Sequence, residues 1–403
     1  MIVSKLEHIL FKAKDYRPLQ ALHQTTTVLL NTVIPLSMLM LLGQVVAVMS
    51  GGRWQELQMV SQLVFEIVYS YLSPLTLVIF MYVLGQKYTL NRITNYLMSL
   101  IAWVAFELPL RNFGSTSIEY ISFAFMIPLC VVLIDTSVDK IMGHLTLSLP
   151  TSIPQSIKES ASSLARQCFK LIAVYALIWG VMQIPFPVIG YIQSSFNLLF
   201  SVYQNPIVFL LLILVLQLLW YRGLHGDALL AAWFEPAIIF STIINMHALI
   251  QGLPVQHIIN ATFYTNFAAA TGAGLTGGIL INYVLRRPRR NVLPEMEQSF
   301  VPALFNINEP LIFGLPIVDN CEFKVAFILA PLLASAVGYT LTVLEIMQVY
   351  TYAVPWFIPF GLKGLMGTGG DLVTALCELL IAILVIVIYA IPTRRYMAKV
   401  KEL

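Results

Sequence analysis

The sequence predicts an all-α polytopic membrane protein with about ten transmembrane helices and two re-entrant hairpins. Of its 403 residues, 58% are hydrophobic and only 11% are charged, whereas roughly a quarter of an ordinary globular chain is charged. Apolar runs of about 20 residues, the length that crosses a bilayer as a helix, recur along the chain. Two further apolar stretches are interrupted by proline and glycine, as is typical of backbone that enters a membrane and returns.

The predicted spans share an apolar composition and end near charged residues, glycine or proline. They cover residues 28–48, 62–84, 93–110, 118–142, 169–188, 207–221, 228–249, 258–285, 323–347 and 372–391. The eighth span contains TGAGLTGG at residues 271–278, whose small side chains favour close helix packing. No Lys-Ser or Lys-Thr pair follows this segment, so it does not predict a phosphate-binding loop.

Basic residues follow every second predicted span. The largest group, RRPRR at residues 286–290, follows the eighth span, while residues 190–205 and 251–257 after two odd-numbered spans carry none. The positive-inside rule therefore predicts that both termini are cytoplasmic. The net charge of +3 is too small to indicate a nucleic-acid partner.

Two amphipathic helices are predicted besides the spans. Residues 1–27 form an interfacial amphipathic helix, and the Ser-rich residues 146–167 form an amphipathic linker helix.

The two interrupted stretches lie at residues 294–320, the first broken segment, and residues 350–370, the second broken segment. Two interpretations are open: re-entrant hairpins that line a substrate site, or loops at the membrane surface. Surface loops should carry more charge than these segments do, which favours the hairpins.

The first broken segment contains PALFNINEPLIFGLPIV, with a single acid, Glu309, and no basic residue. A carboxylate at membrane depth is costly and is therefore usually functional. Two roles are open equally: Glu309 caps backbone donors at the hairpin tip or pairs with an arginine, or it receives a hydrogen bond or a proton from a substrate hydroxyl. Asn306 and Asn308 carry amide groups suited to hydroxyls, and Pro310 fits the start of a second half-helix.

A second candidate segment, residues 219–228, reads LWYRGLHGDA. His225 lies between two glycines, where it is either an interfacial histidine beside Arg222 or a hydrogen-bonding partner of a substrate hydroxyl. Trp220 in this segment and Trp356 in AVPWFIP have the same ambiguity. Each fits the aromatic belt at the membrane interface or the face of a sugar ring.

The sequence predicts no metal and no cofactor. Its four cysteines are far apart and have no paired-ligand spacing, and there is no HExxH motif. A Walker motif is also absent, so ATP is not the expected energy source.

The segment FNINEPLIFGLPIV resembles the signature of enzyme IIC, the membrane component of the bacterial phosphoenolpyruvate-dependent sugar phosphotransferase system. The resemblance is to its lactose/cellobiose/diacetylchitobiose family. LLWYRGLHG, and AVPWFIP followed by GTGGD, resemble two further segments of that family. After GLPIV the chain departs from the family pattern, because Asp319-Asn320-Cys321-Glu322 replaces an Asn-Pro continuation.

The resemblance implies a glucose-superfamily enzyme IIC fold in the bacterial cell membrane. Such proteins are homodimers that join through an N-terminal domain of about five spans, here residues 28–188 with the linker helix. The C-terminal domain, here residues 189–403 with both interrupted stretches, carries a disaccharide across the membrane by an elevator-type motion. The C6 hydroxyl is phosphorylated by the phosphocysteine of a separate enzyme IIB, which enzyme IIA charges. The chain alone is then mainly a permease within a phosphotransferase complex.

The resemblance also implies site residues. Glu309 and His225 would hold the reacting hydroxyl as the catalytic pair, and Trp356 would contact a sugar ring. We extend the predicted substrate-binding set to Asn306, Asn308 and Trp220. An ion-coupled secondary transporter, which also uses intramembrane acids and broken helices, and a non-transporting sugar sensor of the same fold are the alternatives.

Overall fold

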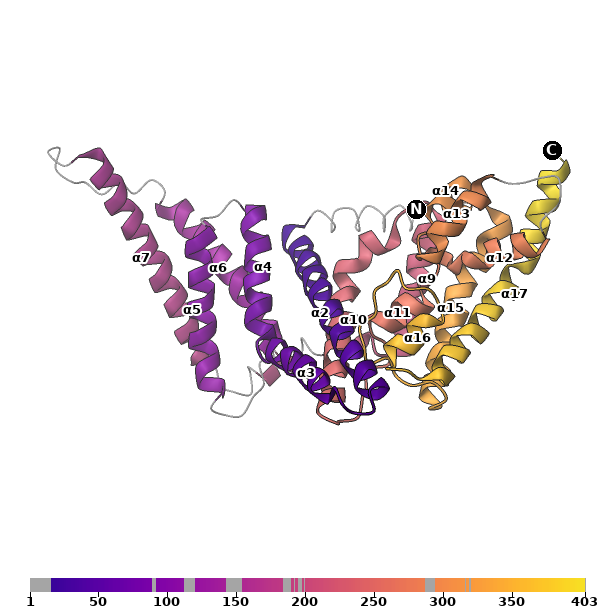
Figure 1. The fold of residues 1–403 in the computed structure, drawn as a ribbon. Coiled ribbons are helices and arrows are strands. Elements are labelled where there is room, and N and C mark those ends of the chain that lie inside the picture. The colour runs from indigo at the N-terminus through magenta and orange to yellow at the C-terminus, as the bar shows by residue number, and fades with distance from the viewer. Residues whose placement is uncertain are drawn as a thin grey trace. The chain divides into compact units, whose positions relative to one another are not determined.

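The computed structural model consists of α-helices joined by turns and loops, with no strand in the part of the chain that it describes (Figure 1). The described residues are 16–88, 92–111, 120–142, 154–183, 190, 191, 193, 194, 198, 200–286, 294–315, 317, 318 and 320–402. The predicted all-α class is therefore confirmed. Most of the interfacial helix predicted over residues 1–27 lies outside these ranges.

The chain folds into two compact units. The first comprises Met1–Leu29 and Glu66–Leu198, and the second comprises Leu30–Phe65 and Leu199–Leu403. The sequence suggested a single cut after residue 188, which would have left residues 30–65 with the N-terminal spans.

One reason for this grouping lies on α2 (Arg17–Met49), in the second unit's share of the helix. Gln44 accepts a hydrogen bond from the hydroxyl of Tyr352, and its Nε2 donates to the carbonyl of Gly369 at 3.4 Å. Both partners belong to the second broken segment. The end of the first predicted span is thereby tied to residues more than 300 positions later.

The first unit contains the four helices that follow α3 (Gln55–Ser70). They are α4 (Leu72–Tyr88), α5 (Arg92–Arg111), α6 (Ile121–Met142) and α7 (Gln155–Met182). The axes of α3 and α4 differ by 62°. Pro74 explains this bend, because a proline ring collides with the carbonyl four residues earlier, here that of Ser70.

Helix α7 differs from expectation in its extent. The sequence suggested a linker helix over residues 146–167 and a separate span from residue 169, but one helix runs without a break from Gln155 to Met182. No proline or glycine separates the two predicted pieces, so nothing stops the helix. Its inner face packs Val174 and Ile178 against Met98 of α5 and Val131 of α6.

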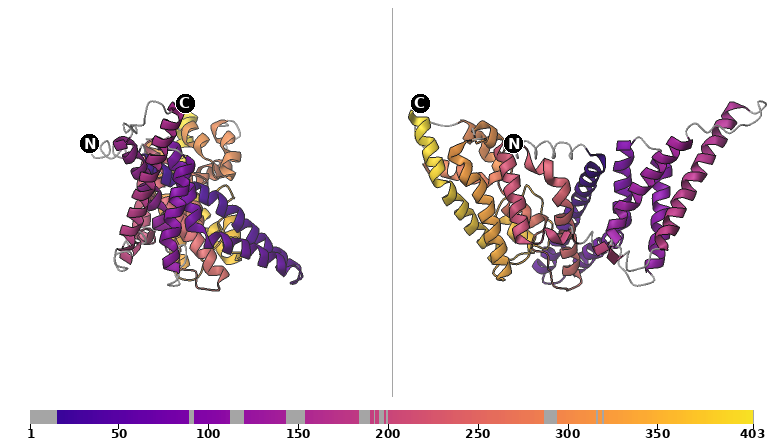
Figure 2. Two further views of the ribbon diagram at one scale, coloured as in Figure 1. Left: turned by 90° about the vertical axis from the view of Figure 1, so that its left-hand side faces the viewer. Right: turned by 180° about the vertical axis from the view of Figure 1, so that it is seen from behind.

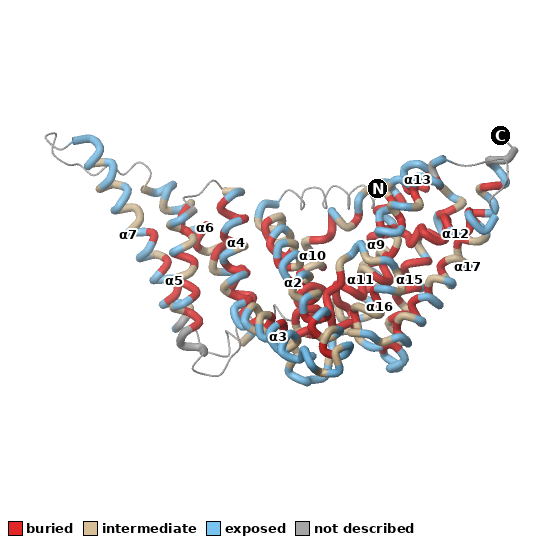
Figure 3. The backbone as a smooth tube through the Cα atoms, viewed as in Figure 1, coloured by how far each residue is buried: buried red, intermediate tan, exposed pale blue. Residues whose placement is uncertain are grey.

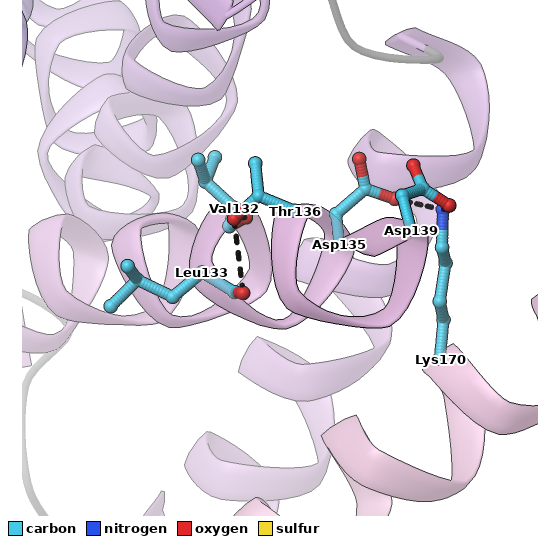
Figure 4. Close-up of polar contacts among 6 residues, drawn as sticks. All are labelled: Val132, Leu133, Asp135, Thr136, Asp139 and Lys170. Carbon is cyan, nitrogen blue, oxygen red and sulfur yellow. Dashed lines mark hydrogen bonds and ion pairs between the residues drawn. The ribbon is translucent and has the colours of Figure 1, made fainter. Parts of the chain in front are cut away.

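A buried ion pair lies one helical turn from this apolar cluster (Figure 4). The Lys170 ammonium lies 2.6 Å from the Asp135 carboxylate and 2.8 Å from that of Asp139. Lys170 and Asp135 are buried, while the Asp139 side chain is 51% exposed. The pair joins α6 to α7 where apolar side chains would otherwise be expected.

The second unit contains the remaining elements. They are α9 (Pro206–Tyr221), α10 (Gly226–Ile250), α11 (Ala261–Phe267), η2 (Ala273–Leu275), α12 (Gly277–Arg286), α13 (Pro294–Leu304), α14 (Glu309–Gly314), α15 (Cys321–Val343), α16 (Leu362–Gly367) and α17 (Leu372–Glu402). Helix α15 packs against α9 and α17, and α17 also packs against α12 (Figure 2). Buried residues are concentrated on α10 and α11 (Figure 3).

The eighth predicted span, residues 258–285, is not one helix. It is divided into α11, the 3₁₀ turn η2 and α12. Thr271 and Leu275 have left-handed φ angles of 54° and 52°, as do Gly272 and Gly274 at 84° and 74°. A Cβ on Gly272 would overlap the Asn308 side chain, and one on Gly274 would overlap the Phe327 ring. The small residues therefore admit side chains from other elements into a break in the helix.

Six helices of the described chain are long and apolar enough to cross a membrane. They are α2, α6, α7, α10, α15 and α17, and the bent pair α3–α4 makes a seventh if it forms one span. Helices α5 and α9 are apolar but shorter. The protein is therefore a multi-pass membrane protein, although fewer than ten helices meet this criterion.

The buried ion pair leads to a prediction about stability. Lys170→Ala leaves the Asp135 carboxylate buried without its partner and should lower the free energy of unfolding by about 3–5 kcal/mol. Thermal unfolding of the detergent-solubilised protein would measure the loss. The matched double variant Asp135→Leu/Lys170→Met removes both charges and should be close to wild type. If the single variant were as stable as the double, the ion pair would not be energetically coupled.

Candidate functional site

Two glycines place His225 in the turn between α9 and α10. Gly223 has a φ of +76° and donates from its amide to the Trp220 carbonyl at 2.9 Å, while Leu224 donates to Leu219 at 3.0 Å. This pair of bonds is a Schellman motif, which ends a helix. A Cβ on Gly226 would lie 2.8 Å from the carbonyl oxygen of Leu216, so only glycine fits there.

His225 begins α10 and leaves one nitrogen available. Its Nδ1 accepts a hydrogen bond from the amide of Ala228 at 3.1 Å, so the neutral ring carries its proton on Nε2. The side chain is exposed, and no described residue is bonded to Nε2. His225 thus caps the helix and still offers one N–H donor to a ligand.

Trp220 lies behind His225, with the two ring centroids 4.2 Å apart. It is 4% exposed, which places it in the interior of the unit and not in an aromatic belt at its surface. Its Nε1 donates to Asp227 Oδ2 at 2.7 Å, and the hydroxyl of Tyr264 donates to Asp227 Oδ1. Asp227 thereby joins α9, α10 and α11.

Asn306 joins the two broken segments. Its Oδ1 accepts from the amide of Thr271 at 2.7 Å, and its Nδ2 donates to the carbonyls of Trp356 at 2.6 Å and Ile358 at 3.0 Å. Its φ of +61° is left-handed, a conformation that asparagine tolerates better than most residues. One side chain therefore satisfies three backbone groups from two other segments.

Asn308 makes a similar link to the divided eighth span. Its Nδ2 donates to the carbonyl of Ala273 at 2.6 Å and to the Thr276 hydroxyl at 2.7 Å. The carbonyl oxygen of its side chain has no partner among the described residues. The amide of Asn306 is fully used by the protein, whereas Asn308 keeps one acceptor. The sugar-binding role predicted for both residues stays a prediction.

Glu309 is the first residue of α14 and is half-buried. No described residue makes a hydrogen bond or an ion pair with its carboxylate. Of the two roles left open by the sequence, capping is not observed, because no side chain caps the start of α14. A half-buried carboxylate without a protein partner can receive a ligand hydroxyl.

Trp356 presents its ring outward from the second broken segment. Its side chain is 49% exposed, although its carbonyl is held by Asn306. Its ring packs edge-on against Phe357 with a centroid distance of 5.9 Å. The outward indole face can meet an apolar ring face, as the stacking interpretation requires.

Helix α11 holds the start of the second broken segment. Asn260 Nδ2 donates to the carbonyl of Tyr350 at 2.8 Å, and the Thr262 hydroxyl donates to that of Tyr352 at 2.9 Å. Lys363 of α16 is fully buried and donates to the carbonyl of Thr265 at 2.9 Å. Short polar side chains thus replace the hydrogen bonds that a regular helix would supply.

Glu378 supports the same segment from α17. It is fully buried and accepts from the Tyr350 hydroxyl at 2.6 Å, from the Gly361 amide at 2.9 Å and from Asn266 Nδ2. Glu378 is not among the site residues predicted from the sequence. Its position inside an apolar helix could have marked it as a polar residue with a structural or functional role. Its hydrogen-bond partners could not be identified from the sequence, because they lie 17 to 112 positions away.

The structure brings the predicted motifs together within the second unit. A Cβ on Gly223 would lie 3.3 Å from the Val318 side chain, so the His225 turn contacts the end of the first broken segment. Asn306 links that segment to the Trp356 segment. No group of His, Cys, Asp and Glu with metal-site geometry occurs among the described residues.

Comparisons with known proteins show which family and fold the chain resembles. A family model described as "Phosphotransferase system, EIIC" matches residues 37–331. The oligo-beta-mannoside-specific EIIC component of Bacillus subtilis is 26% identical over 62% of this chain and 57% of the relative. The cellobiose-specific EIIC component of Lactococcus lactis is 25% identical over 63% and 57%.

The matched region thus spans little more than half the length of these two relatives. The lactose-specific EIICB component of Staphylococcus aureus is 28% identical over 61% of this chain and 43% of the relative. A solved structure, that of the transporter ChbC, the IIC component from the N,N'-diacetylchitobiose-specific phosphotransferase system, superposes with a TM-score of 0.79. It covers 99% of this chain and 98% of its own at 18% identity, so the two share a fold.

The position of Asn306 leads to a second prediction. Asn306→Ala leaves the Thr271 amide and two carbonyls without a partner and should lower the free energy of unfolding by about 1–3 kcal/mol. Amide hydrogen exchange should become faster at Thr271 and around Trp356. Asn306→Gly removes the same bonds but suits the left-handed φ, so it should show the faster exchange with a smaller loss of stability. Unchanged exchange in both variants would contradict the proposed link.

Proposed function

Since this chain belongs to the EIIC family of the phosphotransferase system, we propose that it is a sugar permease that presents a bound sugar's C6 hydroxyl to a phosphorylated enzyme IIB. The observation that carries the proposal is that the Glu309 carboxylate is half-buried and has no hydrogen-bond or ion-pair partner among the described residues. Its neighbours Asn306 and Asn308 are bonded within the protein, while its own half-buried carboxylate has no partner among the described residues. Such a group is costly unless a ligand completes it.

Glu309 and His225 supply complementary chemistry. Glu309 accepts the hydrogen bond of the hydroxyl and takes its proton as the oxygen attacks phosphorus, while the phosphorus–sulfur bond to the enzyme IIB cysteine breaks and the thiolate leaves. His225 donates a hydrogen bond from its Nε2–H to the attacking oxygen and fixes its direction. Phosphoryl transfer depends mainly on positioning and on stabilising charge, so the membrane protein needs to orient the acceptor and not to supply the phosphate.

The substrate we propose is a disaccharide of the cellobiose, lactose or diacetylchitobiose kind. The relatives are named for oligo-beta-mannosides, cellobiose and lactose, and the solved structure is named for diacetylchitobiose. The exposed ring of Trp356 supports a sugar, because an indole face packs well against a pyranose ring. Asn308 Oδ1 is the further proposed contact. Trp220 is 4% exposed, and the sugar contact predicted for it from the sequence stays a prediction.

We propose that enzyme IIB docks where basic residues surround the His225 turn. Lys324 lies 5.8 Å from the Tyr221 ring centroid, next to Arg222, and Lys399 pairs with Glu322. Arg395 lies one helical turn before Lys399, and all of these basic side chains are exposed. A phosphorylated partner is attracted to such a surface. One relative is an EIICB component, in which the two functions are joined.

The proposed topology keeps the ten spans and both re-entrant hairpins, with cytoplasmic termini in a bacterial cell membrane. The short helices α5 and α9 and the divided eighth span would supply the spans that α2, α3–α4, α6, α7, α10, α15 and α17 do not. Exposed apolar residues on α7, such as Leu164, Ile172 and Tyr175, would face lipid or a second copy in a homodimer. The second unit would carry the sugar by an elevator motion.

A transport assay tests the function directly. Vesicles containing the protein should accumulate labelled disaccharide as its phosphate when phosphoenolpyruvate and the soluble phosphotransferase proteins, including enzymes IIA and IIB, are supplied. Uptake driven by a proton or sodium gradient alone would instead identify an ion-coupled transporter. Tight sugar binding without uptake under either condition would identify a sensor.

Glu309→Gln tests the proton acceptor. The amide keeps the size and can still accept a hydrogen bond, but it cannot take the proton, so phosphorylation should fall by about 10²- to 10⁴-fold. Sugar affinity should fall by no more than about tenfold. Glu345→Gln, the same change at an exposed acid of the second unit, is the matched control and should leave the rate unchanged. A wild-type rate in Glu309→Gln would remove Glu309 from catalysis.

A further inference from the structure

Asp227 has a bonding arrangement that the proposed chemistry does not use directly. Its two carboxylate oxygens receive donors from two different helices: Trp220 Nε1 of α9 at 2.7 Å on Oδ2 and the Tyr264 hydroxyl of α11 on Oδ1. Asp227 itself lies in the first turn of α10. A carboxylate can accept on both oxygens, whereas an amide at this position would turn its NH₂ toward one of the donors.

This arrangement acts on the proposed site through Trp220. The indole bonded to Asp227 lies against the imidazole of His225, with the centroids 4.2 Å apart and the ring planes at 45°. The single bond from Ala228 to Nδ1 fixes one atom of the imidazole but not its plane. Contact with an indole that cannot rotate supplies the missing restraint.

Tyr264 holds the other side of Asp227. Its ring is buried and packs against Phe234 with a centroid distance of 5.1 Å. Since its hydroxyl is fixed by this packing, the carboxylate it binds is fixed in turn. Asp227, Trp220 and His225 therefore form a chain of contacts that begins in the core of α10 and α11 and ends at an exposed N–H group.

We propose that Asp227 is a positioning residue for phosphoryl transfer: it immobilises the Trp220 indole, which holds the His225 ring in the orientation that presents Nε2 to the sugar hydroxyl. The proposal rests on the proposed function. Asp227 touches neither sugar nor phosphate, so its removal should affect the rate of transfer more than sugar binding.

The claim that Asp227 holds the His225 ring in place can be tested without measuring transport or phosphorylation. Diethyl pyrocarbonate modifies free imidazole nitrogens, and mass spectrometry of the peptide that contains His225 reports its rate. Asp227→Asn should increase that rate several-fold, because the ring becomes free to move. Asp371→Asn is the matched control, since Asp371 also accepts two hydrogen bonds at a helix start, from the amide and the hydroxyl of Thr374. It should leave the His225 rate unchanged.

The claim that Asp227 affects phosphoryl transfer can be tested by a double-mutant cycle on enzyme IIB-dependent phosphorylation. Asp227→Asn should lower kcat by about 10- to 100-fold, the cost of a small misplacement of a reacting group, with little change in KM. Trp220→Phe removes the same hydrogen bond and should lower kcat similarly, and the double variant should be no worse than the worse single variant. In a His225→Ala background, Asp227→Asn should have almost no further effect.

The outcomes separate this proposal from the function it rests on. If the wild-type protein shows no phosphorylation with charged enzyme IIB, the proposed function fails, and the modification experiment still decides whether Asp227 holds His225. Multiplicative effects of Asp227→Asn and Trp220→Phe, or an undiminished effect in the His225→Ala background, would overturn the positioning role. An unchanged modification rate in Asp227→Asn would overturn it as well.

Discussion

Backbone polar groups away from water must be bonded within the protein, and the second unit depends on how it meets this constraint. The chain is not helical over residues 268–272 or 350–361, so these segments lack the regular backbone hydrogen bonds of a helix. Asparagine side chains do so instead. Asn260 binds the Tyr350 carbonyl, Asn306 binds three backbone groups and Asn308 binds the Ala273 carbonyl. Each primary amide carries donors and an acceptor, which suits it to bridge interrupted backbone segments.

This bonding also distinguishes supporting polar residues from those left for a ligand. Glu378 and Lys363 are fully buried, and each is bonded to other parts of the protein. By contrast, the Glu309 carboxylate and the His225 Nε2 have no partner within the described chain. The two groups differ in chemistry, because one accepts and the other donates. A single hydroxyl within reach of both groups could use both, and this is the arrangement that the proposed function requires.

Much of the architecture could be predicted because hydrophobic length is a local property. The runs at residues 323–347 and 372–391 correspond to α15 and α17, and the charge within PALFNINEPLIFGLPIV marked the segment that carries Glu309. The eighth span could not be predicted as a broken one. Its apolar run is long enough to cross a membrane, and only the insertion of Asn308 and Phe327 beside Gly272 and Gly274 shows why it is divided.

By itself the sequence determined the class of protein and marked the segments that carry Glu309 and His225, because composition and short motifs do not depend on the rest of the chain. The proposed contact of these two residues with the hydroxyl comes from the family resemblance. Only the tertiary structure decided which polar groups are already used. Asn306 proved to be a bridge, Trp220 a buried partner of Asp227, and Glu309 a carboxylate without a protein partner in the described chain. The hydrogen bonds of Asn306, for example, join residues 35 to 52 positions apart, and local sequence patterns do not report them.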